Sequence, residues 1–351
     1  GAAGAGPVGG QAGAGAAGQG GALAACRQPS ANAVWTAVPI ATARGSLAIG
    51  ASSFVAPNAG WLVGEGLIST GPTSAGFIDQ VQRWDGTAWA TSFDGFPSTQ
   101  VQSVFAFGTA DVWAVGNGMF HWDGSTWADL SPPGASTDLF ASVWGARSND
   151  VWAGGDRGLF HWTGLGWAAA TVTPPLDVGF DFGGMWGASA SDVWAGGGYP
   201  ASHDFLGILH WDGTSWSQVV TSFTGYGTGQ HGKIGGVWGS AANDVWAVGS
   251  IDDGSSPIWH YDGTSWTQAT IPALNGVGLA QVIGFCASDI WAAGTASAGG
   301  AGAGAVFHYD GQTWSKVDLG VSVPLLTTIS GVSADDLWVG ALDGTVLHRH
   351  L

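Results

Sequence analysis

Apolar and polar positions along this chain follow one pattern that repeats from about residue 34 to the last residue. Its clearest copy, between Asp111 and Trp127, has the sequence DVWAVGNGMFHWDGSTW, and copies recur at spacings of roughly 39 to 52 residues. Each copy contains four short runs that are rich in Val, Trp and Phe and bounded by Gly, Asn, Asp or Ser, as β-strands are. Seven such copies predict an all-β protein, a seven-bladed β-propeller with four antiparallel strands in each blade.

The third copy illustrates the four predicted strands of each unit. They cover residues 141–145, 150–154, 158–162 and 166–170. No apolar period of 3.6 residues persists for ten residues, so we expect helix content close to nil. The last copy lacks a fourth strand, whereas residues 33–39 (AVWTAVP) match the fourth strands of other copies. We therefore expect the N-terminal strand to complete the last blade and to close the ring.

Tryptophan supplies the predicted core. Of 22 Trp, seven lie on second strands, seven on fourth strands, four after the third-strand His or Arg, and three on first strands. Only Trp259 falls outside this scheme. Because a buried Trp removes roughly 150–250 Å² from water, we predict that these rings pack the core and are not a row of ligand platforms.

The N-terminal region differs in composition from the repeats. Residues 1–25 are almost wholly Gly and Ala, with too few apolar side chains to offset the entropy of ordering. We predict a flexible tether over residues 1–30 and the propeller over 31–351. Such tails resemble the spacers that hold bacterial surface lipoproteins off a membrane, and an interdomain linker is the alternative. The chain begins at Gly1 without Met, which suggests that a leader was removed or never included.

Charge narrows the choice of partners. Lys and Arg number 8 against 25 Asp and Glu, which gives a formal net charge of −17. Such a surface repels phosphate, so we expect no nucleic-acid or anionic-membrane partner. Glu65 is the only glutamate, and this preference for Asp indicates turns rather than helices. No run of 18 apolar residues is present, so no transmembrane segment is expected.

A His or Arg near the end of each third strand forms a ladder along the sequence. Because each belongs to a different blade, these side chains cannot converge on one ion, and we predict no metal site there. We expect each His to form a hydrogen bond with the Asp that begins the second strand, or with backbone, comparable to the His–Asp network of WD-type propellers. The ladder consists of Arg83, His121, His161, His210, His260, His308 and His348.

The cysteines and the Asp-Gly pairs predict local structure. Cys26 and Cys286 are the only cysteines, and a disulfide between them would join the two ends of the ring in an oxidising compartment. Two unpaired thiols are the alternative. The Asp-Gly pairs predict tight turns between third and fourth strands. We predict no cofactor. A calcium ion bound near Asp252 and Asp253 is the alternative, but the sequence there does not have the ligand spacing of an EF-hand or nonapeptide site.

Long loops predict the position of a binding site, because functional residues often lie on loops that a rigid scaffold holds. The loops from second to third strands, and those between blades, share one face of a propeller, and they vary most in length here. Several long ones bring aromatic, His, Asp and Lys side chains to one sector, where sugar stacking or a protein epitope is expected. Tolerated surface variation is the alternative. The predicted ligand-binding residues are Tyr199, His203, Asp204, Phe223, Tyr226, His231, Lys233, Asp252 and Asp253.

Signatures of catalysis are weak. A glycosidase needs two facing carboxylates, and because Glu65 is the only glutamate, both would have to be Asp. A sialidase needs a cluster of arginines, and the arginines of this chain are scattered along the sequence. The sequence has no G-x-S-x-G, H-E-x-x-H or phosphate-binding loop. We therefore predict no catalytic residues, and a hydrolase or lyase acting on polysaccharide is the alternative.

The repeat W-x-V-G…HWDG-x-x-W…V-W-G resembles secreted bacterial Trp-rich propellers and the tectonin lectin repeats over residues 34–351. Tectonin-like proteins recognise glycans, often at sites repeated between blades, so the resemblance implies a glycan ligand. The matching positions are those that build the fold, and the predicted seven blades differ from the six that tectonin-like proteins usually have. We therefore assign no binding residue from this resemblance. The sequence thus favours a non-catalytic recognition module, extracellular or on a bacterial surface, that binds a glycan or a protein. A sensor or structural module of a larger envelope protein is a further alternative.

Overall fold

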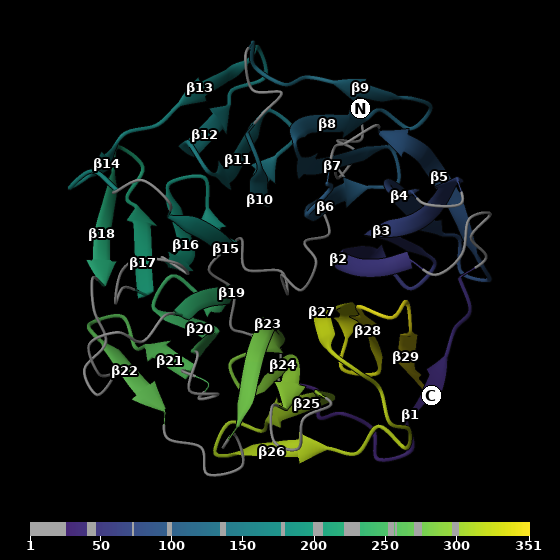
Figure 1. Ribbon diagram of the computed structural model, residues 1–351. Coiled ribbons are helices and arrows are strands. Elements are labelled where there is room, and N and C mark those ends of the chain that lie inside the picture. Colours follow the sequence, from purple (N-terminus) through teal and green to yellow (C-terminus); the bar gives the residue numbers. More distant parts are fainter. Residues whose placement is uncertain are drawn as a thin grey trace, which may run out of the picture.

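The computed structural model is a closed ring of seven sheets, the blades, whose innermost strands surround a central channel (Figure 1). It describes residues 26–40, 47–71, 74–96, 100–133, 138–176, 180–198, 206–220, 232–251, 256, 258–269, 276–296 and 302–351. Within these residues every regular element is a β-strand, which confirms the predicted all-β, seven-bladed propeller. The same residues contain no helix with the length and hydropathy of a membrane span.

Blades 1 to 3 each have four antiparallel strands, which follow chain order from the channel to the rim (Figure 1). Blade 1 consists of β2 (Leu47–Ala56), β3 (Ala59–Gly71), β4 (Ser74–Trp84) and β5 (Trp89–Phe96). Blade 2 consists of β6 (Ser103–Gly108), β7 (Asp111–Gly116), β8 (Gly118–Trp122) and β9 (Trp127–Asp129). Blade 3 consists of β10 (Phe140–Arg147), β11 (Asp150–Gly155), β12 (Gly158–Trp162) and β13 (Trp167–Ala169).

Blade 4 has an extra rim strand, and blade 7 combines the two ends of the described chain. Blade 4 consists of β15 (Asp181–Ser189), β16 (Asp192–Gly198), β17 (Leu206–Trp211) and β18 (Trp216–Val220), with β14 (Val172–Thr173) pairing in parallel with β18. Blade 5 consists of β19 (Gly232–Ala241), β20 (Asp244–Ile251), β21 (Ile258–Tyr261) and β22 (Trp266–Ala269). Blade 6 consists of β23 (Val277–Cys286), β24 (Asp289–Ala296), β25 (Ala303–Tyr309) and β26 (Trp314–Val317). Blade 7 consists of β27 (Leu326–Ser333), β28 (Asp336–Ala341), β29 (Val346–His350) and β1 (Val34–Ala37).

The strands of blade 3 confirm the prediction made from the repeat. All four of its strands begin within one residue of the predicted start, and β12 coincides with the predicted run over 158–162. The register places Trp152 between Trp144 on β10 and His161 on β12. The pairing of β10 with β11 shifts between Gly145 and Arg147, a bulge at the turn that increases the local twist.

Aromatic rings join neighbouring blades at six interfaces, and blade 3 shows the arrangement. Trp152 is stacked on His161 of its own blade, with ring centroids 4.0 Å apart. It also contacts Trp211 and Trp216 of blade 4, at 4.9 and 5.1 Å, and the second of these contacts is edge-to-face at 84°. These contacts confirm that Trp builds the core. Equivalent contacts link Trp61 with Trp122 and Trp127, Trp113 with Trp162 and Trp167, Trp194 with Tyr261 and Trp266, Trp246 with Tyr309 and Trp314, and Trp338 with Trp84 and Trp89.

The predicted Asp-Gly turns join third and fourth strands, as Asp212 and Gly213 illustrate. Asp212 Oδ1 accepts hydrogen bonds from the backbone N–H groups of Thr214 and Ser215, each at 2.8 Å, and from the Thr214 hydroxyl at 2.6 Å. Gly213 has φ of 91°, and a Cβ there would lie 2.8 Å from the Cβ of Ser191 in the neighbouring turn. Only glycine satisfies both conditions without strain.

The N-terminal strand closes the ring, as predicted. In Figure 1 β1 (purple) lies beside β29 (yellow), and the two pair antiparallel from Val34↔His350 to Ala37↔Leu347. The predicted disulfide is also present, because Cys26 is bonded to Cys286 at the end of β23, with Cα atoms 6.0 Å apart. The chain before β1 is therefore attached covalently to blade 6 and by hydrogen bonds to blade 7.

Side-chain hydrogen bonds also tie the innermost strands of the blades that meet at the closure. Ser52 on β2 forms hydrogen bonds with Thr328 and Ser330 on β27. The hydroxyl of Thr328 and the N–H of Ile329 both donate to Gln281 Oε1 on β23, at 2.8 and 3.1 Å. Blades 6, 7 and 1 are thus connected near the channel as well as at the rim.

Replacing Trp152, which is 1% exposed, with Ala should lower the free energy of unfolding by about 3–5 kcal/mol, because it opens a cavity between blades 3 and 4. Trp152→Phe should cost less, since a ring remains for His161 and Trp216 to contact. Denaturant titration of both variants measures the difference. Leu165→Ala is the control, because Leu165 is 96% exposed and should change stability by less than about 0.5 kcal/mol. Equal losses for Trp152→Ala and Leu165→Ala would contradict the proposed role of the ring.

Acid should weaken the Asp-Gly turns. The hydroxyl of Thr214 and the backbone N–H groups of Ser215 and Thr214 lower the pKa of Asp212 to about 2, and a similar turn lowers the pKa of Asp85 to about 2. Because both values lie below the unfolded value of about 3.9, this stabilisation is present above pH 4 and is lost as the pH falls towards 2. The double variant Asp85→Asn/Asp212→Asn keeps the acceptor oxygens but cannot titrate. Its melting temperature should fall less between pH 5 and pH 2 than that of the parent, and an unchanged slope would contradict the prediction.

Candidate functional site

The structure describes one of the nine residues predicted to bind ligand. Lys233 lies on β19, and its Nζ is 2.9 Å from Asp181 Oδ2 on β15, so this cation pairs with the neighbouring blade. Both side chains are roughly one-third exposed, and the pair therefore contributes modestly. The other eight residues, which lie outside the described part of the chain, are Tyr199, His203, Asp204, Phe223, Tyr226, His231, Asp252 and Asp253.

A cavity of about 510 Å³ lies between blades 4 and 5, among the strands nearest the rim. We call it the blade 4–5 groove. β21 and β22 of blade 5 form one wall, β17 and β18 of blade 4 form the other, and Trp194 of β16 lies between them. Its lining residues are Trp194, His210, Val219, Val220, Trp259, Tyr261, Thr264, Ser265, Trp266 and Gln268.

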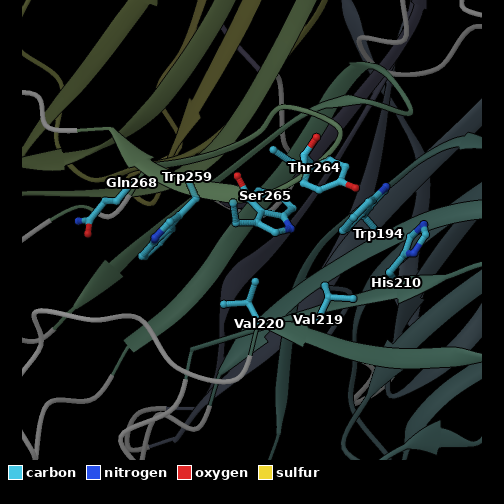
Figure 2. A pocket seen from close by; sticks show the side chains of 10 residues that line it. Trp194, His210, Val219, Val220, Trp259, Thr264, Ser265 and Gln268 are labelled. Atoms are coloured by element: carbon cyan, nitrogen blue, oxygen red, sulfur yellow. The ribbon is translucent and has the colours of Figure 1, made fainter.

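The register of β21 with β22 explains why one wall of the groove is aromatic. Tyr261 pairs with Trp266, and Trp259, two residues earlier on the same face, pairs with Gln268. Tyr261 and Trp266 reach across to Trp194, with centroids 5.0 and 5.4 Å away. In Figure 2 Trp259 and Gln268 lie at one end of the groove, Trp194 at the other, and Val219 and Val220 on the facing strand.

Exposure differs along the groove. Trp259 is only 2% exposed and Trp194 3%, so these two rings form the base. Tyr261 and Trp266 are partly exposed, and Val219 on the opposite wall is 43% exposed. None of the ten described lining residues is Asp, Glu, Lys or Arg. The groove therefore offers apolar surface and neutral polar groups to a ligand.

The hydroxyls at the rim of the groove differ in their hydrogen bonding from those in the equivalent Asp-Gly turns of other blades. In the turns of blades 1, 2 and 4 a Thr or Ser hydroxyl donates to the turn Asp, as from Thr214 to Asp212 at 2.6 Å. In blade 5 the backbone N–H groups of Thr264 and Ser265 donate to Asp262 at 2.8 and 2.9 Å. Among the hydrogen bonds of the described residues, none joins the Thr264 hydroxyl to Asp262. This hydroxyl is exposed beside the groove and can serve a ligand.

The predicted His–Asp pairs are confirmed in six blades. In each, His Nε2 donates to the Asp that begins the second strand, over 2.6 to 2.9 Å, because an ionised carboxylate only accepts. In blade 1 Arg83 takes the place of His and lies 5.5 Å from the Trp61 ring centroid, a cation–π contact. The pairs stand in different blades and each is satisfied locally. In the described residues no three His, Cys, Asp or Glu side chains gather as metal ligands would.

The central channel contains a cavity of about 100 Å³ that residues of the innermost strands line. Its polar lining includes Ser103, Ser142 and Gln281, and no carboxylate is among its described lining residues. Blade 4 approaches blade 5 closely there, since a Cβ on Gly183 would lie 1.9 Å from the Ile234 carbonyl oxygen. The inner strands of these two blades therefore pack directly against each other.

Two carboxylates face each other on blade 1, away from the channel cavity. Glu65 on β3 is the direct partner of Asp79 on β4. Burial and the negative charge of Asp79 raise the pKa of Glu65. Asp79 is only 3% exposed, so the pair has little access to a polymeric substrate.

The sequence contained a signal for the groove that the predicted sector did not use. Trp259 was the one Trp outside the repeat scheme. Its position, directly before the third-strand His, holds Phe or Leu in the other blades with a His, as at Phe160 and Leu209. A Trp at this position in blade 5 indicates that its interface with the neighbouring blade differs from the other interfaces of the ring. The long link that contains Phe223, Tyr226 and His231 leaves β18 at Val220, on the edge of the same groove.

Comparison with known proteins supports the fold. No known protein family matches this chain, and no curated protein matches it. Among solved structures, it is similar to YCF48 bound to D1 peptide, with 20% identity and a TM-score of 0.62 over 90% of this chain and 97% of that one. It is also similar to PorZ, an essential bacterial surface component of the type-IX secretion system of Porphyromonas gingivalis, with 14% identity and a TM-score of 0.59 over 83% and 45% of the two chains.

A hydrolase shares the same architecture. The GH74 xyloglucanase from Xanthomonas campestris matches with 12% identity and a TM-score of 0.56, over 88% of this chain and 59% of that one. At identities of 20% or less these likenesses show the fold alone, which binding proteins and an enzyme both use. The choice between functions therefore rests on the side chains of this chain.

Removing the acceptor of one His–Asp pair should destabilise the ring locally. Asp244 Oδ1 accepts from His260 Nε2 at 2.6 Å and from Trp246 Nε1 at 3.2 Å, and Ser240 donates to its other oxygen. Burial opposes ionisation of Asp244, but these hydrogen bonds outweigh it and lower the pKa of the carboxyl. Asp244→Ala should lower the free energy of unfolding by about 1–3 kcal/mol, since it leaves three donors without their acceptor.

Asp244→Asn is the matched control for this test, because one acceptor oxygen remains. It should cost less than Asp244→Ala at pH 7. The lowered pKa means that the contribution of the carboxylate is present above about pH 4 and is lost as the pH falls through its folded value. Thermal melts at pH 7 and pH 3 measure both effects, and equal losses for the two variants would contradict this account.

Proposed function

We propose that this chain is a non-catalytic recognition module that binds a neutral oligosaccharide in the blade 4–5 groove. The observation that carries the proposal is the groove itself, with one aromatic wall and a rim of neutral hydroxyl and amide groups. Its volume of about 510 Å³ is within the range typical of small-ligand sites, about 300–1,000 Å³. The repeat resembles tectonin repeats in the spacing of its Trp, Val and Gly residues. This resemblance implies glycan recognition between blades and supports the same ligand class.

The chemistry of the lining favours a sugar. A pyranose presents an apolar face of C–H groups, which packs on partly exposed rings such as Tyr261 and Trp266. Its hydroxyls need donors and acceptors, and Thr264, Ser265 and Gln268 are exposed beside those rings. With no described Lys or Arg in the lining and a net charge of −17, an acidic sugar is disfavoured.

Binding without catalysis and a location outside the cytoplasm have separate support. The described lining of the channel cavity has no carboxylate, whereas a glycosidase needs two at a suitable separation. The Cys26–Cys286 disulfide and the likeness to PorZ, a bacterial surface component, support an extracellular or cell-surface location. A protein ligand is the alternative occupant, as YCF48 bound to D1 peptide illustrates for another propeller.

An array of neutral and acidic oligosaccharides, probed with the full chain, tests this proposal, followed by calorimetry with the best ligand. The sequence DGTSW occurs in both blade 4 and blade 5, and only the blade 5 copy contributes its Thr and Ser to the groove. We expect Thr264→Ala/Ser265→Ala to weaken binding about tenfold, since two hydrogen bonds to the ligand are lost. Thr214→Ala/Ser215→Ala, the identical change in blade 4, should leave the affinity unchanged.

A second pair of variants tests the base of the groove. Trp259→Leu introduces the residue type that blade 4 has at Leu209, so the fold should tolerate it while the groove changes shape. Phe307→Leu makes the matched change in blade 6. Loss of binding in the first variant alone supports the groove as the site. Absence of binding to every oligosaccharide would overturn the sugar, and selective binding in a parallel peptide array would then assign the groove to a protein segment.

A further inference from the structure

The segment that closes the ring pairs with blade 7 over a short strand and packs one side chain, Trp35, against the core of blades 6 and 7. We call residues 26–37 the latch, which ends in β1. Only four residue pairs join β1 to β29, and three of the four β1 residues are exposed, with Val34 at 52%. Trp35 is the one β1 side chain that is partly buried. Strand pairing alone therefore buries little of the latch.

The interface between blades 6 and 7, which we call the seam, has an Arg at one position that is aromatic in the other blades. Residue 349 follows the third-strand His, where blades 1 to 6 have Trp or Tyr, and here it is Arg. Arg349 is 6% exposed and lies 5.2 Å from the Trp291 ring centroid, in the place where Tyr309 contacts Trp246 one blade earlier. The seam thus lacks the second aromatic layer that Tyr or Trp would supply.

Arg349 connects the latch to blade 7 through Asp335. Its guanidinium donates to Asp335 Oδ1 at 3.0 Å and to the Ser30 carbonyl at 2.8 Å, and it also binds the Ala334 carbonyl. Asp335 Oδ1 accepts from the Ser30 N–H at 2.8 Å, and Arg27 lies 3.3 Å from Asp335 Oδ2. Blade 7 itself supplies both Arg349 and Asp335, so their ion pair persists if the latch leaves. Release of the latch breaks the contacts of Arg27 and Ser30 with this pair and the pairing of β1 with β29.

The covalent part of the closure is accessible to solvent. Cys26 and Cys286 are both partly exposed, and they line a cavity of about 210 Å³ at the seam together with Arg27, Phe285 and Asp335. The side chain of Arg27, the residue after Cys26, is 78% exposed and pairs with Asp335. Cys286 Sγ lies 3.7 Å from the Ser288 hydroxyl, which can donate to a thiolate that forms there.

We propose that Cys26–Cys286 is a thiol–disulfide exchange site, and that its reduction by a dithiol releases the latch while the other blades stay folded. A thiolate of the dithiol attacks Cys26 Sγ, the bond to Cys286 breaks, and its electron pair leaves on Cys286 Sγ beside Ser288. The second thiol of the reductant then displaces Cys26 from the mixed disulfide. The dithiol is oxidised to its disulfide, and both cysteines take up protons.

The consequence of release is a free strand edge. Without β1, the N–H and C=O groups of β29 that face the rim lose their partners and can pair with another extended segment. Because the other blades stay folded, only the latch gains freedom in the open state, and the disulfide limits that freedom by holding Cys26 at the end of β23. Its reduction should therefore shift the balance between closed and open latch strongly, whereas strands in blades far from the seam are unaffected.

Hydrogen exchange measured by mass spectrometry on the full chain, with and without dithiothreitol, tests this inference. On reduction we expect amides of β1 and β29 to exchange at least about tenfold faster, while amides of β11 in blade 3 keep their rates. Thiol labelling confirms that Cys26 and Cys286 have been reduced. The variant Cys286→Ser should show the fast exchange without reductant and no response to it. A double variant, Cys26→Ser/Cys286→Ser, excludes effects of a single free thiol.

Three results would overturn the proposal. If β1 and β29 stay protected after complete labelling of both thiols, the noncovalent contacts alone hold the latch. If protection is lost in all seven blades together, the disulfide stabilises the whole ring and does not act on the latch alone. If native protein resists a dithiol that reduces the denatured chain, the bond is not an exchange site. Each result is independent of the sugar-binding test, because the groove lies between blades 4 and 5.

Discussion

The edge-to-face packing of tryptophans across blade boundaries is the contact on which the ring depends. The second-strand Trp of one blade meets the fourth-strand Trp of the next at angles between 69° and 90° in six interfaces. This geometry sets the positive edge of one ring against the negative face of the other. Several of these indole N–H groups are buried without a hydrogen-bond acceptor, among them Trp152 and Trp216. The electrostatic contact between rings offsets part of the cost of burying a donor.

The same contact explains why the chain tolerates 62 glycines and so few charges. Glycine lets inner strands approach closely, as at Gly183, but it supplies no side chain to bury and costs backbone entropy. The Trp rings restore the apolar area that glycine lacks, at positions the repeat sets in every blade. His161 and its equivalents complete the layer, since each packs against a Trp ring and donates to the Asp that begins the second strand of its blade, as His161 does to Asp150.

Sequence reasoning succeeded where the repeat carries the information. Blade number, strand order, closure by residues near Trp35, the His–Asp pairs and the Cys26–Cys286 bond all follow from positions that recur or are unique along the chain. The groove was not predicted, because its volume depends on how two walls about 50 residues apart in sequence are spaced in three dimensions. Trp259 departs from the repeat and was the available signal, but a departure says nothing of the space in front of it. The loops that carry most of the predicted sector lie outside the described residues, so that sector stays a prediction.

The attachment of the latch has a mechanical consequence. Tension applied to the chain before Cys26 reaches the sulfur atoms of Cys26 and Cys286 first, and passes through them into β23 of blade 6. The β1–β29 pairing lies further along the chain and is shielded from that tension. With the bond absent, the same tension would act on the Val34 end of β1 and break the four residue pairs between β1 and β29 one after another. The single disulfide thus decides whether force on the N-terminal segment is carried by covalent bonds or by a short ladder of hydrogen bonds.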